Sequence, residues 1–147
     1  MELQLSEYLT GEEYNQLRAS VGWETLTPRQ ARDGIRHSTF LVAFRDGEKP
    51  VAMGRVLFDY GFTAYLADII VSPDYQRQGL GSKVVRTLMD KVQKASDPGD
   101  RIMFILGAAL GKEPFYQTLG FQQRPNEKEG HGMTNWVTVG ENAKSNP

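Results

Sequence analysis

The chain has 147 residues, a formal net charge of −1 and no cysteine. This length fits one domain of ordinary size, and the absence of thiols excludes disulfides, cysteine nucleophiles and cysteine-ligated metals. Lysines and arginines are not clustered, and no apolar run approaches the ~20 residues that span a bilayer, so we expect neither a nucleic-acid nor a membrane partner.

Further expectations concern the location of the protein and its domain organisation. The first four residues lack a basic region followed by a hydrophobic stretch, so we expect no signal peptide and a cytoplasmic protein. Without internal repeats or linkers, residues 1–140 are expected to form one domain. The polar residues 141–147 are expected to be a disordered tail.

The first third of the chain predicts one strand and two helices. Alternating leucines predict a short strand near residue 4, and apolar residues at helical spacing predict a helix over residues 11–20. The Thr-Pro-Arg-Gln sequence at residues 27–30 predicts the start of a short second helix, with a capping threonine and a proline in the first turn.

The middle of the chain predicts three strands and a long helix. Strands are expected at residues 39–44, 50–58 and 62–71, with an Asp-Gly hairpin signal between the first two. Leu80, Val84, Leu88 and Val92 then recur every four residues opposite a charged face, which predicts an amphipathic helix.

The last third predicts a strand at residues 101–106, a helix at 111–119, and strands from residue 121 and at 134–139. This order of elements predicts the α/β class, in its α+β form: a mixed sheet with helices packed on it.

The most informative segment leads from the third long strand into the amphipathic helix. The first amides of a helix have no intrahelical partner and lie at the positive end of its dipole. Gly79 and Gly81 allow a tight turn and the close approach of an anion, and Arg77 can contact a phosphate. A plain strand-to-helix connection explains the same glycines, so spacing alone leaves both interpretations open.

Two phosphate-binding motifs fail on spacing. The dinucleotide motif requires a third glycine where Val84 stands, and a P-loop requires four residues between its glycines. Only three residues separate Gly107 from Gly111, and Glu113 replaces the final Ser or Thr.

The sequence Gln76-Arg77-Gln78-Gly79-Leu80-Gly81 resembles the Gln/Arg-x-x-Gly-x-Gly/Ala signature of the GNAT superfamily, the Gcn5-related N-acetyltransferases. Phe115-Tyr116, followed by Leu119-Gly120-Phe121, resembles the second signature of that family at the expected distance. The resemblance covers residues 42–121. It implies an acyl-CoA N-acyltransferase fold, with a central and mostly antiparallel sheet flanked by helices.

The resemblance also implies acetyl-CoA as co-substrate, with its pyrophosphate on the amides of the loop and its pantetheine arm paired to the preceding strand. The implied contacts are Ile69, Val71, Gln76, Arg77, Gln78, Gly79, Leu80, Gly81, Ser82 and Tyr116. Ala109 stands where many members have an asparagine that bonds the pantetheine arm, which puts that one contact in doubt.

Tyr116 occupies the position at which the family often has a general acid that protonates the leaving thiolate. A thiol has a pKa near 8.5 and a phenol near 10, so this transfer is slightly uphill and the site must tune it. The alternative is an aromatic residue packed on the sheet.

The sequence does not identify the general base directly. Tyr65 and Ala67 stand at the strand positions that align best with those of the family's usual Glu or His base, and neither is an obvious base. Asp68 is the nearest carboxylate and our candidate; alternatively it attracts a cationic amine or bonds a neighbouring loop. Glu24 and Glu113 are weaker candidates. Trp23 either lines the acceptor pocket or anchors the core.

The sequence thus predicts an acetyl-CoA-dependent N-acetyltransferase that uses no metal and acts directly on an amine, most readily a small-molecule primary amine. A peptide or protein amine remains open as the acceptor. A coenzyme-A-binding sensor without turnover and a phosphate-binding regulatory domain are the competing functions. The resemblance is compatible with a homodimer.

Overall fold

The computed structural model describes residues 2–140, so the predicted tail at 141–147 lies outside the described residues. The chain divides into two compact units, the first ending at Leu106 and the second beginning at Gly107. The first unit contains β1 (Gln4–Ser6), α1 (Gly11–Ser20), α2 (Pro28–Arg36), β2 (Phe40–Asp46), β3 (Lys49–Phe58), β4 (Thr63–Val71), a 3₁₀ turn (Pro73–Tyr75), α3 (Leu80–Lys94) and β5 (Met103–Ile105); the second contains α4 (Glu113–Thr118).

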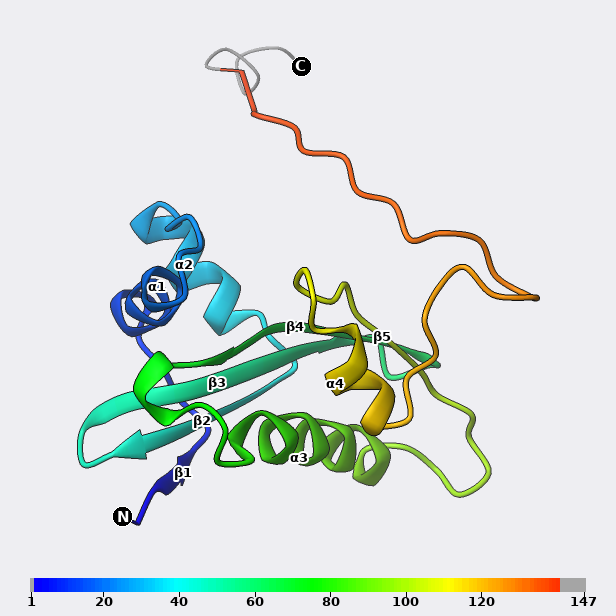
Figure 1. Cartoon of the computed structure of the whole chain (residues 1–147), viewed down its shortest axis with the longest axis horizontal. Helices are drawn as coiled ribbons and strands as arrows, with labels where there is room; N and C mark the ends of the chain where they lie inside the picture. Colours follow the sequence, from blue (N-terminus) through cyan, green and yellow to red (C-terminus); the bar gives the residue numbers. More distant parts are fainter. Residues whose placement is uncertain (1, 141–147) are drawn as a thin grey trace. The chain divides into compact units, whose positions relative to one another are not determined.

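The first unit is built on a five-stranded sheet in the order β1-β2-β3-β4-β5. The first four strands pair antiparallel, whereas β5 pairs parallel to β4 after the crossover through α3 (Figure 1). This mixed, mostly antiparallel sheet with flanking helices confirms the predicted fold class. The predicted β2–β3 hairpin also forms, and Gly47 supplies the positive φ of its turn (62°).

Side-chain caps define the starts of α1 and α2. The Thr10 hydroxyl accepts a hydrogen bond from the Glu13 amide (3.1 Å), and the Glu13 carboxylate accepts one from the Thr10 amide (3.0 Å). The Thr27 hydroxyl accepts from the Gln30 amide in the same way (3.1 Å). Both helices begin where the sequence predicts, because these side chains satisfy amides that have no partner within the helix.

Helices cover both faces of the sheet in the first unit (Figure 1). On one face α1 and α2 pack on the strands through a buried cluster that includes Tyr14, Leu17, Ala31, Leu41, Met53 and Ile70. On the other face α3 lies directly against β3 at Gly54. A Cβ added to Gly54 would stand 2.4 Å from Val84 Cγ1, so only glycine fits there.

The second unit differs from the sequence prediction. Its described residues, 107–140, form α4 but no strand, so the strands predicted from residue 121 and at 134–139 are wrong. An alternating pattern is a local signal, whereas a strand exists only where another strand supplies its hydrogen bonds. Consistent with this, Trp136 is 94% exposed.

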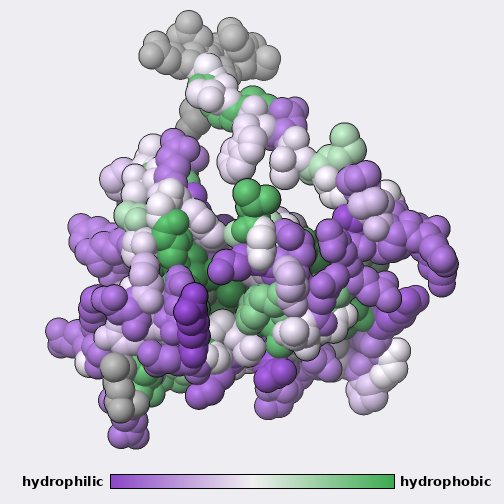
Figure 2. Space-filling view, in the orientation of Figure 1, coloured by the Kyte–Doolittle hydropathy of each residue, from purple (hydrophilic) through white to green (hydrophobic). Residues whose placement is uncertain are grey.

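The face of the molecule seen in Figure 2 is mainly polar. On the face seen in Figure 2, hydrophilic residues cover most of the area and hydrophobic residues form scattered patches. Within residues 2–140, no helix combines the length and apolar character needed to cross a membrane.

Candidate active site

The loop between β4 and α3 is positioned by its connection to the end of the strand. A 3₁₀ turn follows β4, and the Gln76 side-chain amide donates to the Val71 carbonyl (2.9 Å). Arg77 and Gly79 then adopt left-handed conformations, with φ of 64° and 81°. The buried Leu80 anchors the first turn of α3, while residues 76–79 remain exposed. The loop is therefore held at both ends and open between them.

The start of α3 has no side-chain cap, in contrast to α1 and α2. Gly79 is its N-cap residue and has no side chain to accept from the first amides. A Cβ added to Gly79 would meet no atom within 4 Å. Uncapped amides at the positive end of a helix dipole, with open space above them, can hold a phosphate group.

The second half of β4 presents an open edge beside this loop. Within residues 2–106, β5 pairs only with Thr63–Tyr65, which leaves the edge from Leu66 to Val71 without a neighbouring strand. Ile69 and Val71, the predicted pantetheine contacts, lie on this edge and are half-buried. The amides and carbonyls of such an edge can pair with an extended ligand, as in strand addition.

A bulge interrupts β4 at the same place. Met53 lies opposite Ile70 and Arg55 opposite Ala67, so the single residue Gly54 faces both Asp68 and Ile69. Asp68 has a φ of 54°, which is uncommon for a residue other than glycine. Bulges kink a strand and redirect its side chains.

The Asp68 carboxylate accepts three hydrogen bonds and is only 9% exposed. Tyr14 OH donates to Oδ2 at 2.6 Å, Arg55 Nε donates to Oδ2 at 2.7 Å, and Arg18 donates to Oδ1 at 2.9 Å. We call these four residues the Asp68 cluster. Tyr14 and Arg18 come from α1 and Arg55 from β3, so the carboxylate joins three elements of the first unit.

Burial and hydrogen bonding to Asp68 shift the pKa values of Tyr14 and Arg55. Burial, assisted by the hydrogen bond to Asp68, raises the pKa of Tyr14 and keeps its phenol a donor. For Arg55, burial opposes the charged form, but the bond to Asp68 outweighs it and the pKa is raised. Tyr14 is thus held as a neutral phenol and Arg55 as a cation, and both donate to Asp68.

Trp23 lies next to the Asp68 cluster. Its ring packs partly buried against the core, and the Arg18 guanidinium carbon lies 5.6 Å from the ring centroid. Arg18 also donates from Nε to the Glu24 carbonyl (2.7 Å). Both alternatives for Trp23 remain compatible with this position, because the residue contacts the core and the cluster at once.

Tyr116 belongs to the second unit and is described within it. Its ring makes edge contacts with Phe115 and Phe121 at centroid distances of 4.9 and 5.9 Å. Gly120 ends α4 in a left-handed conformation (φ 95°), which returns the chain so that the Phe121 amide donates to the Tyr116 carbonyl (3.1 Å). Burial raises the pKa of Tyr116, so the phenol stays protonated at neutral pH.

Sequence reasoning missed Tyr14, Arg18 and Arg55 as members of a polar cluster. Tyr14 has the spacing of a core residue, and Asp68, which accepts the hydrogen bond from its hydroxyl group, lies 54 residues further along the chain. The one available signal was Arg55, a charge within the otherwise apolar run of β3. A charge within a mostly buried strand usually has a partner, and here the partner is Asp68.

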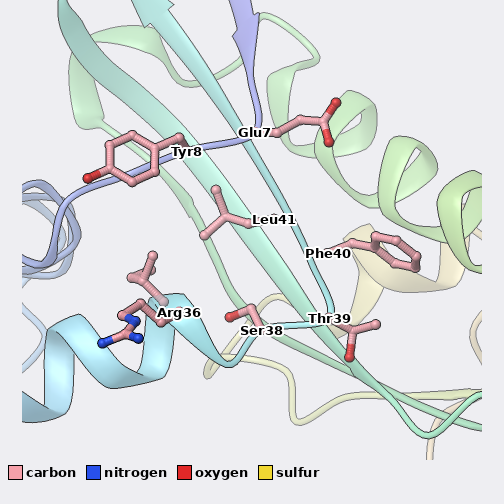
Figure 3. A pocket seen from close by; sticks show the side chains of 8 residues that line it. Glu7, Tyr8, Arg36, Ser38, Thr39, Phe40 and Leu41 are labelled. Atoms are coloured by element: carbon pink, nitrogen blue, oxygen red, sulfur yellow. The ribbon is translucent and has the colours of Figure 1, made fainter.

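A pocket of about 290 Å³ lies elsewhere in the first unit, between the end of β1, the end of α2 and the start of β2. Figure 3 shows Tyr8, Ser38 and Leu41 among the residues that line it. None of the sequence-predicted site residues belongs to it. Within residues 2–140, no three His, Asp or Glu side chains gather as metal ligands.

The chain is similar to a known protein family and to individual proteins. Residues 4–121 match the model of the acetyltransferase (GNAT) family. An uncharacterized N-acetyltransferase, ycf52 of Porphyra purpurea, is 29% identical over 126 residues, which cover 80% of this chain and 68% of the relative. The chloroplastic GCN5-related N-acetyltransferase 1 of Arabidopsis thaliana is 29% identical over 131 residues, covering 85% of this chain and 62% of that protein.

A solved structure shows the same fold. It is a probable acetyltransferase of unknown function from meticillin-resistant Staphylococcus aureus, with a TM-score of 0.80 and 25% sequence identity. The similarity covers 92% of this chain and all of that chain, so the architecture agrees well beyond the signature segments.

Proposed function

The chain belongs to the acetyltransferase (GNAT) family and is an N-acetyltransferase; on this premise we propose that it transfers the acetyl group of acetyl-CoA directly to a small-molecule primary amine. The observation that carries the choice of donor is the uncapped start of α3 beside the open edge of β4. This pair suits a ligand with a phosphate group and an extended amide-bearing arm.

The proposed donor contacts combine this geometry with the roles that the family resemblance implies. Amides from Arg77 to Ser82 hold the pyrophosphate, and the backbone of Ile69 and Val71 pairs with the pantetheine arm. A strand N–H near Val71 stabilises the oxyanion that forms when the amine attacks the thioester carbonyl. Tyr116 donates the proton to the departing thiolate; burial raises its pKa, which keeps the phenol protonated before the step but makes the transfer itself more uphill.

The role of Asp68 as general base stays a prediction. Its oxygens already accept from three donors, which favours the alternative that this carboxylate holds neighbouring elements together. A protein or peptide amine remains the second candidate acceptor, and the sensor without turnover remains the second candidate function.

Two further expectations also stand as proposals. The family model spans residues 4–121 and thus crosses the division at Leu106, which supports one functional domain made of both units. The cytoplasmic location is retained as a prediction, although the Arabidopsis relative is named as chloroplastic.

Calorimetric titration tests the donor assignment. We expect acetyl-CoA to bind at least about tenfold more tightly than ATP, because only acetyl-CoA has an arm that can pair with the edge of β4. Equal affinities would instead favour a simple phosphate-binding domain.

A further inference from the structure

The left-handed conformation of Asp68 coincides with the bulge that interrupts the regular pairing of β3 with β4. Aspartate adopts this conformation more readily than most residues with a Cβ, but at a cost compared with glycine, so surrounding contacts help to maintain it. Opposite the bulge, Gly54 leaves room for Ile69 Cδ1, which would stand 2.8 Å from a Cβ on residue 54. The surroundings of Asp68 and Ile69 thus contribute to the conformation of their backbone.

The contacts available to hold this conformation are those of the Asp68 cluster. Arg55 projects from β3, and Tyr14 and Arg18 lie four residues apart on α1, so they share one helix face. Three donors from two elements leave the carboxylate little freedom to rotate. Because the side chain is fixed, the Cα of Asp68 and the peptide units on either side of it are fixed as well.

The same peptide units lie within the open edge of β4. Ile69 follows Asp68 directly, and Val71 lies three residues beyond it. A small shift at the bulge would tilt the amides and carbonyls of this edge. Displacements of about 1 Å at a reacting site can lower a rate about 100-fold.

We propose that the Asp68 cluster sets the direction of the β4 edge at Ile69 and Val71, and that Arg55, Arg18 and Tyr14 are positioning residues for the acetyl donor. This inference rests on the proposed function, since it assumes that the donor pairs with this edge. None of the three residues needs to touch the donor, because each acts through the carboxylate of Asp68.

The chain contains a matched control for Arg55. Arg45 is exposed to the same extent (17%) and pairs with Glu13 of α1 at 2.8 Å, but it lies on β2, away from the bulge. Arg55→Lys and Arg45→Lys therefore make the same chemical change in two comparable ion pairs. Only the first pair holds the β4 edge.

We expect Arg55→Lys to raise the KM for acetyl-CoA about tenfold or more, with the pH dependence of kcat unchanged, and Arg45→Lys to stay within about twofold of the wild type. Amide hydrogen exchange at residues 69–71 should become about tenfold faster in Arg55→Lys and stay unchanged in Arg45→Lys. Equal effects of the two substitutions, or an altered pH profile without a change in KM, would overturn the proposal.

A second pair of variants examines the backbone directly. Asp68→Gly and Asp68→Ala both remove the carboxylate, but only glycine adopts the left-handed conformation at no cost. We expect acetyl-CoA to bind about tenfold more weakly to Asp68→Ala than to Asp68→Gly, and equal affinities would contradict the proposal. If the wild type itself does not bind acetyl-CoA, the proposed function fails, while hydrogen exchange still tests the link between cluster and edge.

Discussion

Tyr116 is the residue on which the proposed proton transfer depends. Tyr116→Phe keeps the ring and its contacts with Phe115 and Phe121 but removes the hydroxyl. We expect kcat to fall about 100-fold or more, while the affinity for acetyl-CoA changes less than about twofold. Steady-state kinetics and calorimetry measure the two quantities, and an unchanged kcat would assign Tyr116 a packing role.

The pH dependence of the activity provides a second test of Tyr116. The phenol acts as an acid only while protonated, and burial raises its pKa above the ordinary value of 10. Activity that depends on Tyr116 should therefore persist through neutral pH and decline only above about pH 10. This alkaline decline should disappear in Tyr116→Phe.

Asp68→Asn separates the two roles considered for this carboxylate. A general base must lose its proton before it acts, so its removal would abolish the part of the rise of kcat/KM with pH that reflects its own titration. Positioning predicts a lower kcat/KM whose rise with pH is preserved, and we expect this second result. Profiles of kcat/KM against pH for both proteins decide between the roles.

At the scale of elements, the start of α3 carries the most specific prediction. Asp and Asn tolerate a left-handed conformation better than other residues with a side chain, so Gly79→Asp and Gly79→Asn should fold. Only aspartate brings a negative charge to the proposed pyrophosphate site. We expect Gly79→Asp to weaken acetyl-CoA binding at least about tenfold more than Gly79→Asn does, whereas equal affinities would remove the phosphate assignment.

Sequence reasoning was most successful where the signal for an element is local. The cap at Thr27, the hairpin turn at Gly47 and the helix from Leu80 each depend on a few neighbouring residues, and all three are confirmed. For the candidate site, the sequence predicted the loop with its glycines, and the structure shows its uncapped helix start.

The bulge and the polar cluster could not be predicted in this way. The bulge follows from the pairing register of β3 and β4, which an alternating pattern does not contain. The cluster joins Asp68 to Arg55 and to Tyr14, which lie 13 and 54 residues away along the chain. The prediction of strands after residue 121 was wrong for a related reason, because an alternating pattern does not identify the partner strand that must supply the hydrogen bonds.

At the scale of the whole molecule, the ion pair between Glu13 and Arg45 predicts a pH dependence of stability. The hydrogen bond from Arg45 lowers the pKa of Glu13 below its ordinary value of 4.5. A carboxylate with a lowered folded-state pKa stabilises the fold above its unfolded pKa and loses this contribution as pH falls through the folded pKa. The free energy of unfolding should thus fall as the pH drops below about 4.5.

Glu13→Gln provides the test of this pH dependence, with the exposed neighbour Glu12→Gln as its control. Urea unfolding between pH 2 and pH 7 should show a weaker acid dependence in Glu13→Gln than in the wild type. Glu12→Gln should follow the wild type closely, because no ion pair holds its carboxylate within the described residues. Identical acid profiles for all three proteins would contradict the account of this ion pair.

The proposed function depends on acetyl transfer by one chain, in which the β4–α3 loop and the open edge of β4 bind the donor and Tyr116 supplies the proton. Thiol release from acetyl-CoA, followed for the wild-type protein with a panel of small primary amines and lysine-containing peptides, measures this transfer directly. We predict release that depends on an added amine, is fastest with a small amine, and is lost in Gly79→Asp. Tight binding of acetyl-CoA without thiol release on any amine would contradict the account and favour a coenzyme-A sensor.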